Sequence, residues 1–185
     1  MKIKALTLLC FIGFIACEGP IGPSGPEGPR GPEGPAGGVE FSSVLEIFEV
    51  NFNPDNNYSI LFEFPPDEVE FFDAVLVYVL WETLESPDGD IPVWRLMPQT
   101  FFLEDGIYQY NFDHTFTDVT IFLEGNQSLD LLPPDYTDNQ IFRIVVVPGE
   151  FIEPNGRYDF SDYEATIRLF GLENEPIKRI KADEI

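Results

Sequence analysis

Glycine recurs at every third position from residue 19 to residue 37 of the 185-residue chain, and no other feature constrains the fold of a segment as tightly. The positions are Gly19, Gly22, Gly25, Gly28, Gly31, Gly34 and Gly37, and a proline follows each of the first six. Three polyproline II chains wind together only if every third residue lacks a side chain, because that residue faces the crowded axis. Proline at the next position fixes φ near the required value. We therefore expect residues 17–38 to form an extended stalk.

This segment resembles the repeats of bacterial collagen-like proteins, and the resemblance covers Gly19–Gly37 alone. It implies a homotrimer wound through the stalk. A single-stranded polyproline II spacer is the alternative, since six triplets are few for a stable triple helix. At about 3.1 Å per residue, the stalk extends about 55 Å in either state. It would lift the following domain away from the point of attachment.

The N-terminus has the pattern of an export signal. Met1-Lys2-Ile3-Lys4 is a short positive start, and the apolar run from residue 5 to residue 16 is about half the length that spans a bilayer. The run ends in Phe14-Ile15-Ala16-Cys17, which resembles the lipobox of bacterial lipoproteins. The resemblance implies that residues 1–16 are a signal peptide and that diacylglycerol is attached to the Cys17 thiol.

Two alternatives to lipidation at Cys17 remain open. In the first alternative, Cys17 is an ordinary cysteine near a general secretory cleavage site. In the second, Cys10 is the acylated residue. Cys10 follows the bulky Leu9 and would leave too short an apolar run. With Cys17 acylated, two or three acyl chains would hold the chain on a membrane without spanning it. We then expect a cell-envelope location, at the outer membrane or the cell surface.

Residues 39–185 are expected to form one globular head. The whole chain is 44% hydrophobic and 15% aromatic, which suffices for a core. Its 33 acidic residues against 10 Lys and Arg give a net charge of −23. Such a surface repels phosphates, so we expect no nucleic-acid partner. Both cysteines, Cys10 and Cys17, lie N-terminal to the head, so a disulfide framework in the head is excluded.

Short apolar and aromatic runs separated by turn residues predict a mainly β head, an antiparallel β-sandwich of the immunoglobulin-like or jelly-roll-like kind. In Ile107–His114, tyrosine and phenylalanine alternate with polar residues, as in a strand with one buried face. Ala74–Trp81 is apolar throughout and is expected to be a central strand covered on both faces. The predicted strands are Val44–Phe52, Tyr58–Phe64, Ala74–Trp81, Val93–Met97, Thr100–Glu104, Ile107–His114, Asp118–Leu123 and Ile141–Val147.

Turn and cap residues add further predictions. Asp105-Gly106 predicts a tight hairpin, and Tyr136 is a candidate to cap a sandwich corner through its hydroxyl. Residues 161–171 predict one short helix that begins at Ser161 or Asp162 and stops at Gly171. The cationic stretch Ile177–Ile185 either lies against the acidic head or forms a loose tail.

The head offers few residues for catalysis. His114 is the single histidine, which excludes histidine-based metal triads, and no nucleophile elbow occurs in the head. His114 is therefore interpreted as a polar residue at a strand end. Trp81 and Trp94 lie inside predicted strands and are interpreted as core residues rather than as sugar-stacking platforms. We expect no enzymatic activity and no cofactor.

Calcium is the one metal for which the sequence supplies candidate ligands. Asn53, Asp55 and Asn57 alternate like the first ligands of an EF-hand loop, but Tyr58 stands where that loop needs glycine. Asp88 and Asp90 flank a glycine in a second acidic loop. Both stretches also fit solvated turns, which we prefer.

Together these features predict a non-enzymatic envelope lipoprotein that displays a β-sandwich head on a collagen-like stalk, in a structural or adhesive role. The alternative is a ligand-binding module for carbohydrate or peptide. Exposed aromatic residues gathered on one face of the head would favour that alternative.

Overall fold

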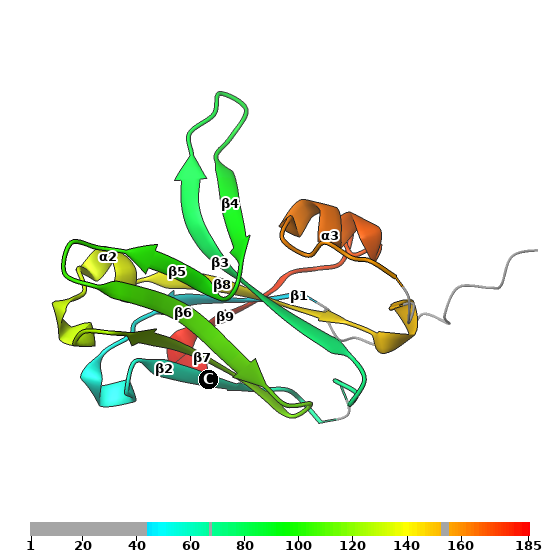
Figure 1. Cartoon of the computed structure of the whole chain (residues 1–185). Coiled ribbons are helices and arrows are strands. Elements are labelled where there is room, and N and C mark those ends of the chain that lie inside the picture. The colour runs from blue at the N-terminus through cyan, green and yellow to red at the C-terminus, as the bar shows by residue number, and fades with distance from the viewer. Residues whose placement is uncertain (1–43, 67, 153–155) are drawn as a thin grey trace, which may run out of the picture. The chain divides into compact units, whose positions relative to one another are not determined.

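Two β-sheets lie face to face in the computed structural model, which describes residues 44–66, 68–152 and 156–185 (Figure 1). The five-stranded sheet has the order β4-β3-β8-β1-β9, and the four-stranded sheet has the order β2-β7-β6-β5. Their bounds are β1 Val44–Val50, β2 Ser59–Glu63, β3 Ala74–Leu84, β4 Ile91–Leu96, β5 Gln99–Phe102, β6 Ile107–His114, β7 Asp118–Gly125, β8 Gln140–Val147 and β9 Lys178–Lys181. The predicted β-sandwich is confirmed. Cys17 and the stalk glycines lie outside the described residues.

The chain passes repeatedly from one sheet to the other. β1 and β3 belong to the five-stranded sheet and β2, between them in sequence, belongs to the four-stranded sheet. β8 lies between β3 and β1, so strands distant in the sequence are hydrogen-bonded neighbours. This long-range pairing ties both ends of the head into one sheet.

The core between the sheets is formed by alternate residues of facing strands. Val77 and Ile144 are fully buried partners on β3 and β8. Tyr108 and Ile121 face them from β6 and β7 and are also buried. Gln109 and Asn111, which face outward on β6, are polar and partly exposed, as the period of two predicted.

The five-stranded sheet is covered on both faces. On β3, Val75, Val77 and Val79 face the core between the sheets, and Tyr78 faces the cluster under α3 (Tyr163–Leu169). The prediction that Ala74–Trp81 is covered on both sides is therefore confirmed, although β8 holds the middle position of the sheet.

α3 is the helix predicted from residues 161–171. Asp162 is its N-cap and accepts a hydrogen bond from the Ala165 amide at 2.9 Å. Gly171 follows its C-cap with a φ of +68°, a conformation that favours glycine. Ile167 is buried against the sheet. Further single turns lie at η1 Pro54–Asn56, η2 Leu129–Leu131, α2 Pro134–Thr137, η3 Gly149–Phe151 and η4 Ala182–Glu184.

β9 departs from the expected fold. The stretch Ile177–Ile185 does lie against the head, but as a strand that pairs parallel to β1, so the sandwich is not purely antiparallel. Arg179 and Lys181 form ion pairs with Glu46 and Glu49 of β1. These ion pairs help to hold β9 against β1. The sequence of β9 is too polar to predict a strand.

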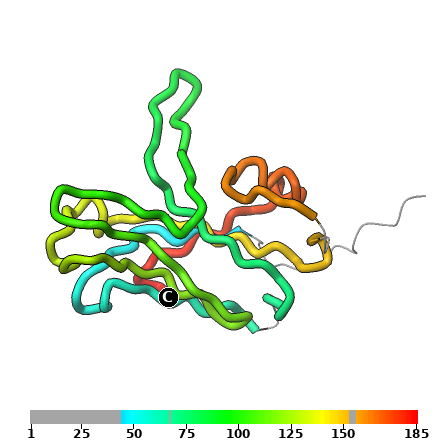
Figure 2. The backbone as a smooth tube through the Cα atoms, viewed as in Figure 1, coloured from blue at the N-terminus to red at the C-terminus, as the bar shows by residue number. Residues whose placement is uncertain are grey.

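Two hairpins carry the predicted turns. Leu103 and Gly106 exchange backbone hydrogen bonds at 2.9 and 3.4 Å, which confirms the tight hairpin between β5 and β6. The β3–β4 hairpin is longer and projects from the rest of the head, as the green loop in Figures 1 and 2 shows. Its tip turns at Ser86–Gly89, where Gly89 has a φ of +116°.

Candidate functional site

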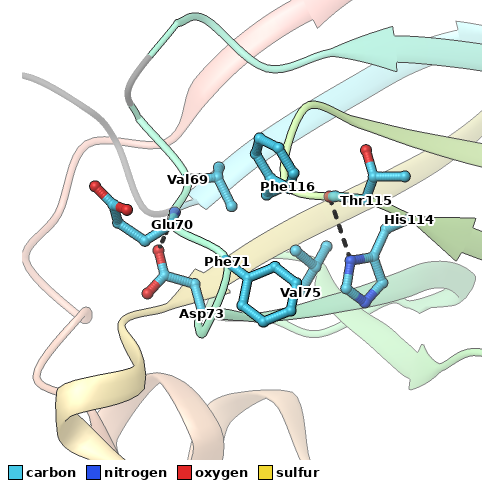
Figure 3. A pocket seen from close by; sticks show the side chains of 8 residues that line it. All are labelled: Val69, Glu70, Phe71, Asp73, Val75, His114, Thr115 and Phe116. Atoms are coloured by element: carbon cyan, nitrogen blue, oxygen red, sulfur yellow. Dashed lines mark hydrogen bonds between the residues drawn. The ribbon is translucent and has the colours of Figure 1, made fainter.

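A hollow of about 380 Å³ opens between the loop before β3 and the turn between β6 and β7 (Figure 3). We call it the aromatic hollow. In Figure 3 the rings of Phe71 and Phe116 lie on opposite sides of it. Its lining residues are Val69, Glu70, Phe71, Asp73, Val75, His114, Thr115 and Phe116.

The two phenylalanines that line the hollow, Phe71 and Phe116, are exposed, and so is Phe72, which follows Phe71 in the sequence. Phe71 exposes 86% of its surface, Phe72 65% and Phe116 54%. Val69 and Val75, by contrast, are buried and join the hollow to the core. Exposed apolar groups that gather around a concavity mark an interaction surface, whereas scattered ones do not.

The loop that carries Phe71 and Phe72 is held by Asp73. One carboxylate oxygen of Asp73 accepts a hydrogen bond from the Glu70 amide at 2.8 Å, and the other accepts one from the Gly149 amide at 2.9 Å. Gly149 also permits a close approach, because a Cβ there would lie 2.4 Å from the carbonyl oxygen of Phe72. The loop is thus positioned by hydrogen bonds while its aromatic rings remain exposed.

The opposite wall is the turn between β6 and β7. The Thr115 hydroxyl donates to the Asp118 carboxylate at 2.9 Å and accepts from the Thr117 amide at 3.0 Å. The Phe64 amide donates to the Thr117 carbonyl at 2.8 Å, which ties the turn to the segment after β2. Phe116 is therefore presented by a well-braced turn.

The described residues that line the aromatic hollow include carboxylates but no Lys or Arg. Residues 64–73 and 113–118 contain no Lys or Arg but include Glu68, Glu70 and Asp113. The Glu70 carboxylate forms no hydrogen bond or ion pair with the described residues, and a buried oxygen of Glu68 likewise lacks a partner among them. Negative charge near the hollow is thus left unneutralised by the described part of the chain.

A second hollow adjoins the first. It has a volume of about 310 Å³ and shares Val69, Glu70 and Phe116 with the aromatic hollow. Phe64, Pro65, Pro66 and Thr117 complete its lining. The two hollows together offer a longer surface than a single side chain would fill.

Another hollow, about 210 Å³ in volume, lies where β3 meets α2, and its Tyr110 and Gln140 side chains are already hydrogen-bonded. The Tyr110 hydroxyl donates to the Tyr136 carbonyl at 2.7 Å, and Gln140 donates to the carbonyls of Asp135 and Asp138. Burial raises the pKa of Tyr110 well above its usual range. Tyr110 therefore ties α2 to the sheet, in the corner role that we predicted for Tyr136.

Glu46 on β1 is the centre of a charged network on the outer face of the five-stranded sheet. Its two carboxylate oxygens accept hydrogen bonds from Arg143 at 2.9 Å and from Arg179 at 2.7 Å. Arg143 in turn lies 4.1 Å from the ring centroid of Trp94. Each group of this network has its partner within the head.

His114 lies at the end of β6, as expected, and it also lines the aromatic hollow. Its ring stacks on Phe112 at 6.2 Å, and its Nδ1 lies 3.4 Å from the Thr115 carbonyl oxygen. Trp94 is buried, as interpreted from the sequence, whereas Trp81 is partly exposed and carries Arg95 at 4.0 Å.

The calcium candidates lie in exposed turns. Asn53 caps η1, and its side-chain oxygen accepts hydrogen bonds from the amides of Asp55 and Asn56. Asp88 and Asp90 lie in the exposed tip of the β3–β4 hairpin. Among residues 44–66, 68–152 and 156–185, no group of three or more His, Cys, Asp or Glu is placed to hold a metal ion.

Phe71, Phe72 and Phe116 were not identified from the sequence. Phe71 and Phe72 interrupt an acidic stretch between two predicted strands, and Phe116 lies in the turn after Ile107–His114. One signal in the sequence could have identified them. Each is an aromatic residue in a segment without the period of a strand or a helix, and such a segment has no regular buried face in which the ring would be hidden.

No helix in the described part of the chain is long and apolar enough to cross a membrane. Comparisons of the chain with protein-family models, with curated proteins and with solved structures find no match.

Proposed function

We propose that the chain is a lipid-anchored cell-envelope protein that displays its β-sandwich head on a collagen-like stalk, in a structural or adhesive role and without catalysis. The observation that carries the proposal is the order of segments along the chain. An apolar leader ends at Cys17, an unbroken Gly-Pro-X repeat follows, and β1 begins soon afterwards at Val44. Anchor, spacer and folded head in this order are what surface display requires.

The partners in this proposal are a membrane, held through the acyl chains on Cys17, and two further copies of the chain where the stalk winds as a triple helix. A shared membrane and stalk would raise the effective concentration of heads, so that weak contacts made by each head add up to strong attachment.

Metabolic labelling with a palmitate analogue tests the anchor. Wild-type chain is expected to carry the label and to fractionate with the cell envelope, and Cys17→Ser is expected to lose both properties. Cys10→Ser is the matched control and retains the label, since Cys10 lies within the removed leader. Unlabelled wild-type chain released from cells with its leader intact would refute the proposal.

The aromatic hollow favours a second candidate function, which refines the first. Two exposed phenylalanines, Phe71 and Phe116, line one concavity rather than lying scattered over the head. This is the feature that favours a ligand-binding module. In this version of the proposal the displayed head attaches to a ligand through the aromatic hollow.

A further inference from the structure

We propose that the aromatic hollow binds a peptide segment of another protein that carries an apolar side chain next to an arginine or lysine. The inference deepens the ligand-binding proposal, on which it rests, by naming the chemical class of the ligand.

The apolar part of the ligand follows from the lining. Phe71 and Phe116 offer exposed ring faces, and Val69 and Val75 lie buried beside them. The volume of about 380 Å³ falls within the ordinary range of ligand pockets. An aliphatic or aromatic side chain that enters the hollow removes these faces from water, which is the main source of affinity at such a surface.

The basic part of the ligand follows from a pattern that recurs within the head. Arg95 lies 4.0 Å from the Trp81 centroid, Arg143 lies 4.1 Å from that of Trp94, and Arg179 lies 4.8 Å from that of Phe48. Arg143 and Arg179 also pair with the Glu46 carboxylate. Aromatic ring, carboxylate and guanidinium are therefore a combination that this head uses to hold segments together.

The aromatic hollow has the first two members of that combination and lacks the third. Phe71 supplies the ring and the adjacent Glu70 supplies a carboxylate with no partner among the described residues. None of the described residues that line the hollow is a Lys or Arg. A cation from a partner would complete the set, and the net charge of −23 would speed its approach.

Two other occupants fit less well. A second copy would bring Glu70 and its acidic neighbours against the same groups, which is unfavourable for like charges. A sugar needs several polar partners for its hydroxyls, and the hollow offers few, because Asp73 and Thr115 are engaged in holding its walls. A second copy as the occupant is one of the outcomes of the experiment below.

Three fluorescent heptapeptides test the proposal, with the full lipidated chain in non-ionic detergent and fluorescence anisotropy as the readout. In the first peptide arginine alternates with leucine, in the second glutamate alternates with leucine, and in the third arginine alternates with serine. The first is expected to bind about tenfold more tightly than either of the others, because it alone supplies both the apolar and the basic group.

Three variants locate the binding. Phe71→Ser is expected to weaken binding of the arginine–leucine peptide about tenfold, and Glu70→Gln about threefold. Phe102→Ser is the matched control, since Phe102 on β5 is also highly exposed, at 73%, and does not line the hollow. It is expected to change the affinity less than about twofold.

Each contrary outcome has a distinct meaning. Equal binding by the arginine–serine peptide, unchanged in Phe71→Ser, refutes the proposal in favour of general attraction to an acidic surface. Preference for the glutamate–leucine peptide, lost in Phe71→Ser, refutes the basic ligand but leaves ligand binding at the hollow intact. No peptide binding, with self-association that Phe71→Ser abolishes, identifies a second copy as the occupant and overturns the inference while leaving the display proposal unaffected.

Discussion

Two regions of the head combine aromatic rings with carboxylates, and they differ in whether the chain supplies the cation. Around Glu46, Arg143 and Arg179 neutralise the carboxylate, and Arg143 lies over Trp94. At the aromatic hollow, Phe71 and Glu70 have no such partner within residues 44–66, 68–152 and 156–185. The comparison teaches that ring, carboxylate and guanidinium stabilise the fold where the chain supplies all three. Where it supplies only the ring and the carboxylate, they form an open surface.

The difference also lies in burial. Glu46 exposes 6% of its surface, so its charge is tolerable only because two guanidinium groups compensate for the lost water. Phe71 exposes 86% and contributes little to the core. Substitutions in the two regions should therefore separate stability from binding, and the predictions below test this in order of decreasing effect on stability.

Glu46→Ala is expected to lower the free energy of unfolding by about 3–5 kcal/mol. The substitution leaves the guanidinium of Arg143, whose side chain is 14% exposed, without its carboxylate. It also releases Arg179 and so loosens β9 from β1. Chemical denaturation measured by circular dichroism gives the value.

Glu49→Ala is the matched control on the same strand. Its partner Lys181 is 37% exposed and Glu49 itself is 50% exposed, so the loss is expected to be about 0–1 kcal/mol. Equal losses for Glu46→Ala and Glu49→Ala would mean that the network around Glu46 contributes no more than a surface ion pair, and the contrast between the two regions would disappear.

Tyr78→Phe is expected to lower the free energy of unfolding by about 1 kcal/mol near neutral pH. The Tyr78 hydroxyl donates to the Phe160 carbonyl at 2.8 Å, beneath the start of α3. Removing the hydroxyl leaves the Phe160 carbonyl without this hydrogen bond, while the phenylalanine ring still fills the space of the tyrosine ring. Chemical denaturation at pH 7 measures this loss.

The pH dependence of the same variant gives a sharper test. Burial is the main cause that raises the pKa of Tyr78 from 10.0 to about 12. Because the pKa of Tyr78 is higher in the folded state, the contribution of its protonated hydroxyl to the free energy of unfolding is complete below pH 10. That contribution is lost as the pH rises from 10 to about 12. The gap between wild type and Tyr78→Phe should therefore narrow over that interval. A constant gap from pH 7 to pH 12 would show that Tyr78 titrates alike in the folded and unfolded states.

The sandwich could be predicted because its strands follow two simple patterns. β6 alternates between polar and aromatic residues, since one face of the four-stranded sheet meets water. β3 and β8 are apolar almost throughout, since the five-stranded sheet is covered by the other sheet and by α3. The local pattern of polar and apolar residues is enough to predict a strand where burial of its side chains follows that pattern.

The remaining features depend on contacts between distant segments. β9 carries three charged residues in four, and it is a strand because it pairs with β1, which lies far away in the sequence and supplies Glu46 and Glu49 to its cations. The aromatic hollow likewise requires the loop before β3 to meet the turn after β6. Neither arrangement can be read from the local pattern, so the sequence placed His114 at a strand end but did not identify Phe71 and Phe116 as residues of a hollow.

Phe71→Ser is expected to change the free energy of unfolding by less than about 0.5 kcal/mol, the smallest effect of the series. The ring is mostly in water already, so its removal leaves no cavity. Phe101→Ala is the contrasting substitution: Phe101 is 5% exposed, stacks on Tyr136 at 4.6 Å, and should cost about 3–5 kcal/mol. Thermal and chemical denaturation of both variants measure the difference. A loss above about 1 kcal/mol for Phe71→Ser would mean that the exposed rings support the fold, and their exposure would then no longer favour a binding role.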